Sequence, residues 1–137
     1  MGHHLTTYIT HDTLISALGF GTQENLEAIR SYHSGITLQT DKRIADTPLL
    51  AATLSQERLQ QQAEAIGVSG YPRMEQLFIL TINELIRQSG QTLEDKTCGL
   101  ILSTTKGNID LLARHTEHPD EAVFLWKMAE NIAGYFH

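Results

Sequence analysis

Cys98 is the only cysteine in the 137-residue chain, and therefore the only thiol that could act as a nucleophile. An activated thiolate needs a helix N-terminus or a nearby cation to lower its pKa. Cys98 instead opens the apolar run 98–102, where a cysteine usually behaves as a small hydrophobic side chain. We therefore predict that Cys98 is buried and slow to react, and we assign it no catalytic role.

Ser103 and Lys106 match the Ser-x-x-Lys pattern of serine β-lactamases and penicillin-binding proteins. That chemistry needs both residues at a helix start, together with Ser-Asp-Asn and Lys-Thr-Gly motifs that this sequence lacks. Gly107 after Lys106 favours a turn, and the Gly-Lys-Ser/Thr order of a phosphate loop is missing. The Gly-Phe-Gly stretch at 19–21 is only a fragment of a dinucleotide fingerprint. We predict no cofactor at either place.

A metal site is conceivable near His115 and His118, which have Glu117 and Asp120 beside them. Imidazole and carboxylate groups suit zinc or nickel. No second ligand pair stands at a defined spacing, however, and Pro119 interrupts any shared helical face. We interpret this stretch as a solvated loop and predict no bound metal.

The composition narrows the class of protein. A formal net charge of −6 with scattered basic residues argues against nucleic-acid binding, which needs clustered Lys and Arg. No apolar stretch approaches the roughly 18 to 20 residues of a membrane span, and the N-terminus does not resemble a secretory signal. A single cysteine excludes an internal disulfide. We expect a cytoplasmic protein, in which His3 and His4 are either a tag remnant or natural sequence.

Three helices are predicted by start and stop signals in the first 90 residues. Thr22 is a candidate N-cap for a helix ending near Arg30, with Leu26 and Ile29 on its apolar face. Ser55 precedes a second helix that runs to residue 66, with Gly67 after it.

The segment 73–88 is the strongest predicted element. Pro72 suits its first position and Gly90 its end, and its apolar residues leave only a narrow polar stripe. We therefore expect this helix to be buried on most sides.

Strands are harder to find than helices. The stretch 6–10 has strand composition, and the run 98–102 is typical of an interior strand in a parallel sheet. Residues 37–48 are mixed and polar, as in a surface excursion. We predict an α/β domain over residues 1–137, but two strands are too few for its sheet. Either strands between 36 and 48 escape detection or part of the sheet is absent.

The C-terminal part is predicted to be helical. Residues 108–114 favour a short helix, and Pro119 suits the start of a last helix that Gly134 ends. One face of that helix collects an aromatic residue and three alanines, which favours packing over ligand stacking: Ala122, Trp126, Ala129 and Ala133.

Three segments together resemble the ketoacyl synthase branch of the thiolase-like family. The first has Tyr-Ile-Thr at 8–10 and Ile-Ser-Ala-Leu-Gly at 15–19. The second has Glu-Asn-Leu-Glu-Ala-Ile-Arg-Ser at 24–31 and Ser-Gly-Ile at 34–36. The third is the helix 73–88 with the run 98–107, which ends in a Ser/Thr-rich turn. The resemblance implies part of the N-terminal half of a thiolase-like α-β-α layered fold.

Four positions depart from the family pattern. His11, Thr13, Ser103 and Lys106 stand where glycine is commoner in the family. Glycine allows a close backbone approach that these side chains do not. The departures indicate a divergent subgroup, and the family's substrate pocket is therefore not carried over to this chain.

The resemblance also implies an activity. The family extends an acyl chain by decarboxylative Claisen condensation, using a Cys at a strand-to-helix turn and two His, or His and Asn. In the family that turn follows the helix that ends here near Gly134, and the other catalytic residues come later. We therefore expect residues 1–137 to be an incomplete segment without catalytic, cofactor-binding or metal-binding residues, with an acyl carrier protein as the partner of the parent enzyme.

Two other functions remain open. The chain could be a non-catalytic thiolase-like subunit that pairs with an active synthase, or a small α/β binding domain. If sheet strands are missing, open edges and apolar faces favour self-association.

Overall fold

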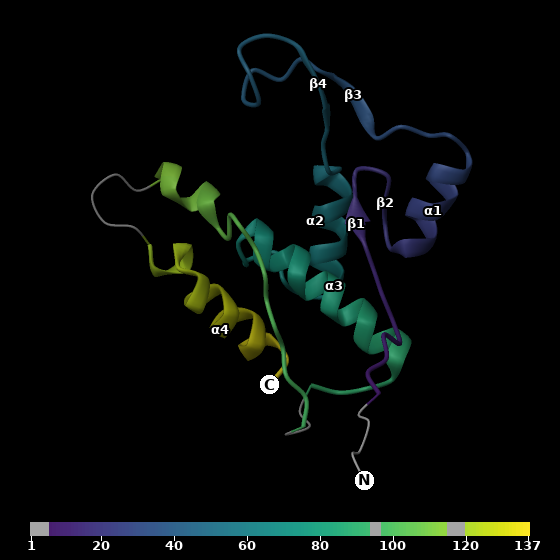
Figure 1. Cartoon of the computed structure of the whole chain (residues 1–137). Coiled ribbons are helices and arrows are strands. Elements are labelled where there is room, and N and C mark those ends of the chain that lie inside the picture. Colours follow the sequence, from purple (N-terminus) through teal and green to yellow (C-terminus); the bar gives the residue numbers. More distant parts are fainter. Residues whose placement is uncertain (1–5, 94–96, 115–119) are drawn as a thin grey trace.

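The computed structural model describes residues 6–93, 97–114 and 120–137. Figure 1 shows α3 (Arg73–Ser89) at the centre, with α2 (Gln56–Ala65) and α4 (Leu125–Tyr135) near it. The short 3-10 helices η1 (Ile109–Arg114) and η2 (Glu121–Val123) precede α4. No helix in the described part is long and apolar enough to cross a membrane.

Helix α3 forms where the sequence predicts it, but the expectation that it is buried on most sides is wrong, because only three of its residues are buried and the others are half-buried or exposed. Glu75, Ile79 and Ile82 recur at helical spacing and form its buried face. Pro72 is the N-cap instead of the first helical residue, and Gly90 ends the helix in the left-handed conformation with φ 67°. A residue without Cβ adopts that conformation without steric cost.

Helix α2 also forms where its signals predict. The Ser55 hydroxyl accepts a hydrogen bond from the Arg58 backbone N–H at 3.2 Å, which satisfies one of the free donors of the first turn. Gly67 follows the helix with φ 74°. Leu59 and Ala63, one helical turn apart, are buried, so this helix presents that face to the core.

Helix α4 completes the core, with a different face inward from the one predicted. Met128 and Ile132 are its buried residues, whereas Trp126 is 57% exposed. The helix continues through Gly134 to Tyr135, so the prediction that Gly134 ends it is wrong. Glycine within a helix costs about 1 kcal/mol relative to alanine. The hydrogen bond from the Tyr135 hydroxyl to the Ile66 carbonyl at 3.1 Å helps to hold this last turn in place.

The core is a small cluster between α2, α3 and α4. Its buried apolar residues come from all three helices and the turn after α2: Ala63, Val68, Ile79, Ile82, Met128 and Ile132. Because helix faces contribute nearly all of it, the core depends on helix packing and not on a sheet.

The first hairpin and helix form a compact unit around Asn25. Strands β1 (Ile15–Ser16) and β2 (Gly19–Phe20) pair antiparallel, and α1 (Thr22–Arg30) follows directly. Asn25 is 2% exposed, and its amide nitrogen donates to the carbonyls of Leu14, Gly19 and Gly21 at 3.2, 3.1 and 2.8 Å. Its oxygen accepts from the Ser16 hydroxyl. One amide therefore satisfies the backbone of the whole turn.

Two predictions for α1 are wrong in detail. Gly21, not Thr22, is the N-cap, and Thr22 is already helical with its hydroxyl bonded to Asp12 at 2.9 Å. The predicted apolar face is not buried, since Leu26 is 39% and Ile29 57% exposed. The polar contacts of Asn25 hold this helix in place instead.

A second hairpin lies where a polar surface excursion was predicted. Strands β3 (Ile36–Gln39) and β4 (Leu49–Ala52) pair antiparallel in the register Ile36 with Ala52 and Gln39 with Leu49. It extends away from the helices in Figure 1. Residues 40–48 form the connection. The four residues of β3 alternate apolar and polar, but a run this short beside a polar stretch is a weak strand signal, and β3 lies in the range where undetected strands were left open.

The predicted parallel sheet is not formed in the described residues. The chain combines helices with strands, but its strands form two separate antiparallel pairs. Neither 6–10 nor 98–102 is a strand, although both are rich in β-forming residues. Strand composition alone is insufficient, because a strand also needs a neighbouring backbone to pair with.

We predict that Ser55→Ala destabilises the protein by about 1 kcal/mol, since the first turn of α2 loses its side-chain acceptor. Urea denaturation followed by circular dichroism measures the change. Exposed Ser69, which caps no helix, provides the control Ser69→Ala with an expected change below about 0.5 kcal/mol. Equal stability of the two variants would contradict the capping role.

Candidate functional site

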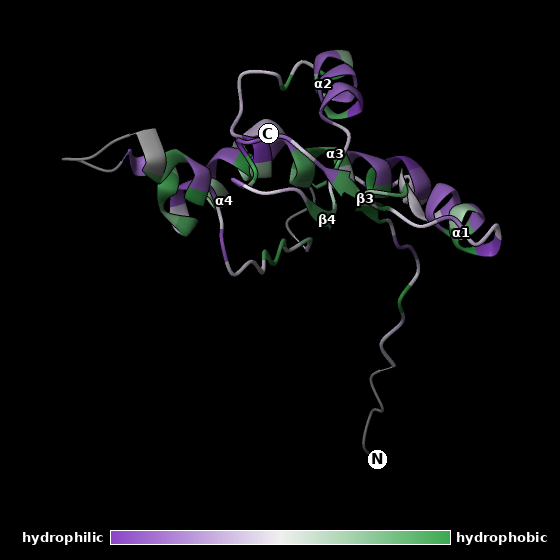
Figure 2. Cartoon of the chain, turned by 90° about the horizontal axis from the view of Figure 1, so that it is seen from above, coloured by the Kyte–Doolittle hydropathy of each residue, from purple (hydrophilic) through white to green (hydrophobic). Residues whose placement is uncertain are grey.

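The most unusual surface of the molecule is an exposed apolar segment at residues 98–102. Ile101 is 93% and Leu100 41% exposed, and Cys98 is exposed as well. Figure 2 shows the apolar residues of this segment on the outside of the helical layer. The predicted interior strand is therefore an extended segment with one side open to solvent.

The other side of this segment faces α4 across a groove of about 440 Å³. Leu100 and Leu102 line it from the extended segment, and Ala129 and Ala133 line it from α4. Small alanines leave the space that larger residues would fill. The two alanines of the predicted packing face thus border a groove, and the hydroxyls of Ser103 and Thr104 lie at its rim.

The turn after the segment is built by Thr104 and Gly107. The Thr104 hydroxyl accepts hydrogen bonds from the backbone N–H groups of Lys106 and Gly107 at 3.2 and 3.0 Å. Gly107 has φ 55°, and a Cβ there would lie 2.6 Å from the Leu125 side chain. Residues 103–106 are consequently not helical, which confirms the turn predicted for this Ser-x-x-Lys stretch.

The prediction that Cys98 is buried is wrong. Its thiol is exposed at the start of the extended segment, where it borders shallow pockets with Thr97 and Leu93. It does not lie at a helix start, the usual place of an activated thiolate. Cys98 is exposed because the segment 98–102 pairs with no strand in the described residues. An apolar segment that lies outside a sheet is covered by the rest of the chain on one side only.

A buried polar cluster anchors the turn and α4 to α3. The Glu75 side chain is fully buried in the first turn of α3. Asn108, also fully buried, donates to its carboxylate at 2.7 Å and to the Ala122 carbonyl at 2.8 Å. Asn131 of α4 donates to both carboxylate oxygens at 3.3 Å. Three separate elements therefore meet at one carboxyl group.

Hydrogen bonds only partly compensate for the burial of the polar groups in this cluster. Burial raises the pKa of Glu75, and the hydrogen bonds from Asn108 and Asn131 only partly oppose that effect. The Asn108 amide oxygen is buried and has no hydrogen-bond partner in the described part of the chain. A buried acceptor without a donor is costly, so this cluster is held in place by its surroundings.

A second polar cluster lies at the opposite end of the molecule. Arg58 of α2 binds the Glu24 carboxylate through both guanidinium ends, at 2.9 and 3.0 Å. The guanidinium lies 4.9 Å from the centre of the Phe20 ring, whose backbone N–H also donates to Glu24. These bonds lower the pKa of Glu24, with the Arg58 side chain as the main cause. The cluster joins β2, α1 and α2. The Gly-Phe-Gly stretch at 19–21 is therefore part of the first hairpin and of its contact with α2.

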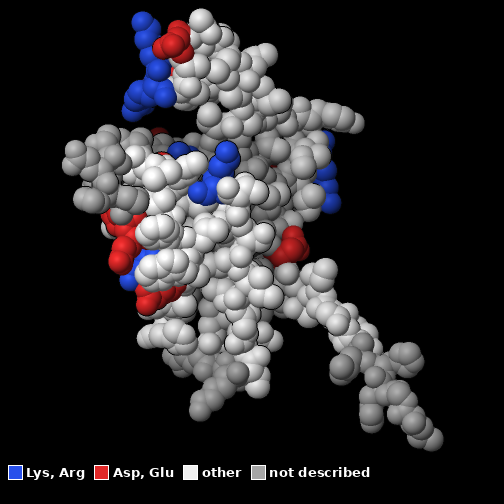
Figure 3. Space-filling model, turned by 60° about the vertical axis from the view of Figure 1, so that its left-hand side comes forward, with Lys and Arg blue, Asp and Glu red and all other residues white. Residues whose placement is uncertain are grey.

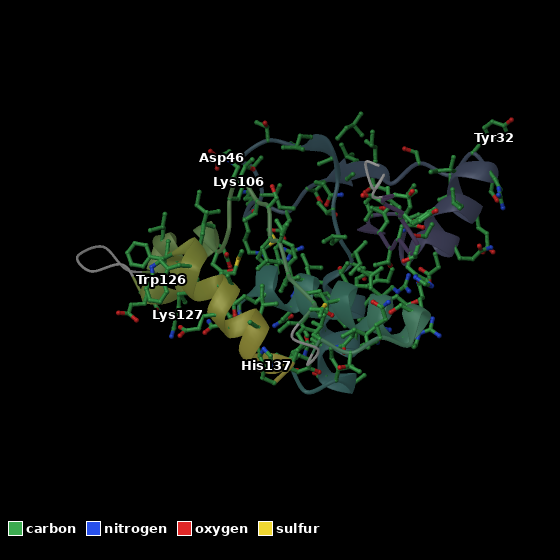
Figure 4. The ribbon with its side chains drawn as sticks, turned by 60° about the horizontal axis from the view of Figure 1, so that its bottom comes forward. Tyr32, Asp46, Lys106, Trp126, Lys127 and His137 are labelled. Atoms are coloured by element: carbon green, nitrogen blue, oxygen red, sulfur yellow. The ribbon has the colours of Figure 1, made fainter. Side chains whose placement is uncertain are left out.

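The remaining candidate residues are solvated or lie outside the described residues. His115, Glu117 and His118 fall in the undescribed stretch 115–119, and the described residues contain no cluster that could hold a metal ion. Trp126 and Lys127 lie together on the outer side of α4, with the ammonium 5.8 Å from the indole ring (Figure 4). On the face shown in Figure 3, basic and acidic side chains are interspersed.

Sequence reasoning missed Glu75, Asn108 and Asn131. A signal existed for Glu75, because it lies four residues before Ile79 and seven before Ile82, on the same helical face. A charged residue on the buried face of a helix needs a polar partner. Nothing in the sequence identifies Asn108 and Asn131 as those partners, since they are 33 and 56 residues away.

Comparison with known proteins adds no relative: no protein-family model, curated protein or solved structure matches this chain. The functional interpretation therefore rests on the chain's own residues and geometry.

We expect Cys98 to react with a thiol reagent at similar rates in the native and the denatured chain, because its side chain is exposed. Labelling with a chromogenic disulfide at about pH 8, near the ordinary cysteine pKa, measures both rates. Native labelling slower by about a hundredfold would mean that the segment is covered in solution.

Proposed function

We propose that this chain provides the N-terminal segment of a thiolase-like 3-oxoacyl-(acyl carrier protein) synthase and is inactive by itself. In the complete enzyme the family reaction is a decarboxylative Claisen condensation of acyl and malonyl thioesters. The acyl carrier protein is the corresponding partner. The motif resemblance at 8–19, 24–36 and 98–107 suggests this family.

The observation that carries the proposal is a pair of extended segments, 6–10 and 98–102, that pair with no strand in the described residues. Ile9 is 94% exposed in the N-terminal segment, and Ile101 is 93% exposed in the second. Both segments extend from the same side of the helical layer in Figure 2. An α-β-α layered fold places a sheet on that side of such helices. The arrangement is that expected of a helical layer whose sheet is incomplete.

Energetics support the same interpretation. Full burial of one isoleucine side chain contributes about 1.5–3 kcal/mol. The chain leaves Ile9, Leu100 and Ile101 largely outside its core, and its core contains only a handful of buried apolar residues. Added strands would cover these side chains and pair their backbones at once.

The residues of the chain fit a segment that has no catalytic role of its own. Covalent catalysis requires a nucleophile and an activating group within hydrogen-bond reach. Cys98 is the only thiol of the sequence, and it lies in an extended segment instead of a strand-to-helix turn. In the family, two His, or His and Asn, hold the thioester oxygen. We assign no residue of 1–137 to that role.

A non-catalytic subunit of the same fold is the second candidate, and the same exposed segments favour it. A partner chain could cover them as well as further sequence could. The reading frame beyond His137 separates the two. A Cys in a short small-residue turn there supports the synthase segment, and a stop codon supports the subunit.

We incubate the chain with carrier protein that bears an acyl group and carrier protein that bears a malonyl group. We expect no 3-oxoacyl product, since no activated nucleophile is assigned. Mass spectrometry of the carrier proteins detects the product. Turnover that disappears in Cys98→Ser would overturn the proposal, and would identify Cys98 as the nucleophile.

We also expect the chain to self-associate through the exposed segment, and Ile101→Lys to shift it towards monomer. A buried lysine charge opposes pairing of such a segment. Sedimentation velocity measures the distribution. Ile29→Lys, at a 57% exposed position on α1, is the control and should leave association unchanged. A wild-type chain that stays a monomer would contradict this expectation.

A further inference from the structure

The carboxyl group of Glu75 lies where the C-terminal third of the chain meets α3. Asn108 connects it to the turn before η1 and, through the Ala122 carbonyl, to η2. Asn131 connects it to α4. Elsewhere between α3 and α4, the Asn83 amide donates to the Tyr135 hydroxyl at 3.4 Å. Near the C-terminal end of α4 the Tyr135 hydroxyl also donates to the Ile66 carbonyl at 3.1 Å. Glu75 is therefore the one ionisable group among the polar attachments described between α4 and the rest of the core.

No cation balances this group in the described residues. Its partners are two neutral amides, and no ion pair of the described chain includes Glu75. Among the neighbouring charged residues whose side chains the structure describes, Lys127 is half-buried and binds Glu130 at 2.6 Å. The others are exposed: Arg73, Lys106, Asp110, Asp120, Glu121 and Glu130. An ionised Glu75 would thus be an uncompensated buried charge.

The neutral acid suits the cluster better. A protonated carboxyl brings an O–H donor, and the cluster contains the unpartnered buried amide oxygen of Asn108. The ionised form brings only acceptors. The O–H donor of the protonated acid and the burial of the carboxyl group therefore both favour the neutral form of Glu75.

We propose that Glu75 is a proton-operated latch, in which the neutral carboxyl holds α4 and the turn at 103–108 against α3, and its ionisation releases them. Release exposes Ile79 and Met128, which are buried in the closed state, to solvent. The inference is independent of the proposed function, because it rests only on the buried cluster.

The sign of the pH effect follows from linkage. Burial raises the pKa of Glu75 in the closed state above that in the open state. The closed state is then fully favoured below the ordinary glutamate pKa, and is lost as pH rises through the raised pKa. Between the two values, one proton is released on opening, so the opening constant rises by up to about tenfold per pH unit.

Hydrogen exchange with mass spectrometry tests the latch on the full chain. Protection of α4 peptides is compared with that of α2 peptides between about pH 4.5 and 7.5, after correction for intrinsic exchange. We expect α4 protection to fall as pH rises over this range while the α2 reference changes less. The variant Glu75→Gln should show no such fall. Glu84→Gln on the exposed side of the same helix, where Glu84 pairs with Arg87 at 2.6 Å, should retain it.

Two results would overturn the proposal. One is constant α4 protection across this range in the wild-type chain, and the other is an unchanged pH dependence in Glu75→Gln. If Glu75→Gln does not fold, carboxyl-carbon NMR of the wild-type chain decides. A glutamate that titrates above the ordinary range, together with the α4 amide shifts, supports the latch, and its absence overturns it.

Discussion

A single buried carboxyl group, that of Glu75, joins three elements of the C-terminal part of the fold: α3, the turn before η1 and α4. Glu75 occupies a position on the inner face of α3 that the helical period assigns to a hydrophobic residue. Its presence requires polar partners, and Asn108 and Asn131 supply them from two other elements. The apolar contacts of Ile79, Met128 and Ile132 lie beside this cluster. Packing contributes most of the stabilisation, but the polar partners decide where the turn and α4 attach.

The second constraint is strand pairing. Both hairpins pair their own neighbours, β1 with β2 and β3 with β4, and the segments 6–10 and 98–102 pair with no strand in the described residues. Local antiparallel pairing costs little loop entropy, whereas a parallel sheet joins strands that are far apart in sequence. Residues 6–10 and 98–102 are separated by most of the chain. A helical layer with exposed β-rich segments on one side is the consequence, and the groove beside Ala129 and Ala133 borders it.

The N-terminal unit shows how polar contacts replace a hydrophobic core. Leu26 and Ile29 of α1 point outward, and Asn25 points inward to four backbone and side-chain groups. Arg58 then ties this unit to α2 through Glu24 and the Phe20 ring. This unit and the helical core therefore meet through an ion pair and a cation–π contact.

The sequence by itself determined the helices, because their signals are local. Ser55 and Gly67 bound α2, and Gly90 ends α3, each through contacts within a few residues. The mixed composition of helices and strands was predictable at the same level. The pairing of strands was not, because the same apolar run at 98–102 suits an interior strand or an exposed segment, depending on which backbone lies beside it. The partners of Glu75 were decided only by the tertiary structure, since Asn108 and Asn131 become its neighbours when α4 packs on α3.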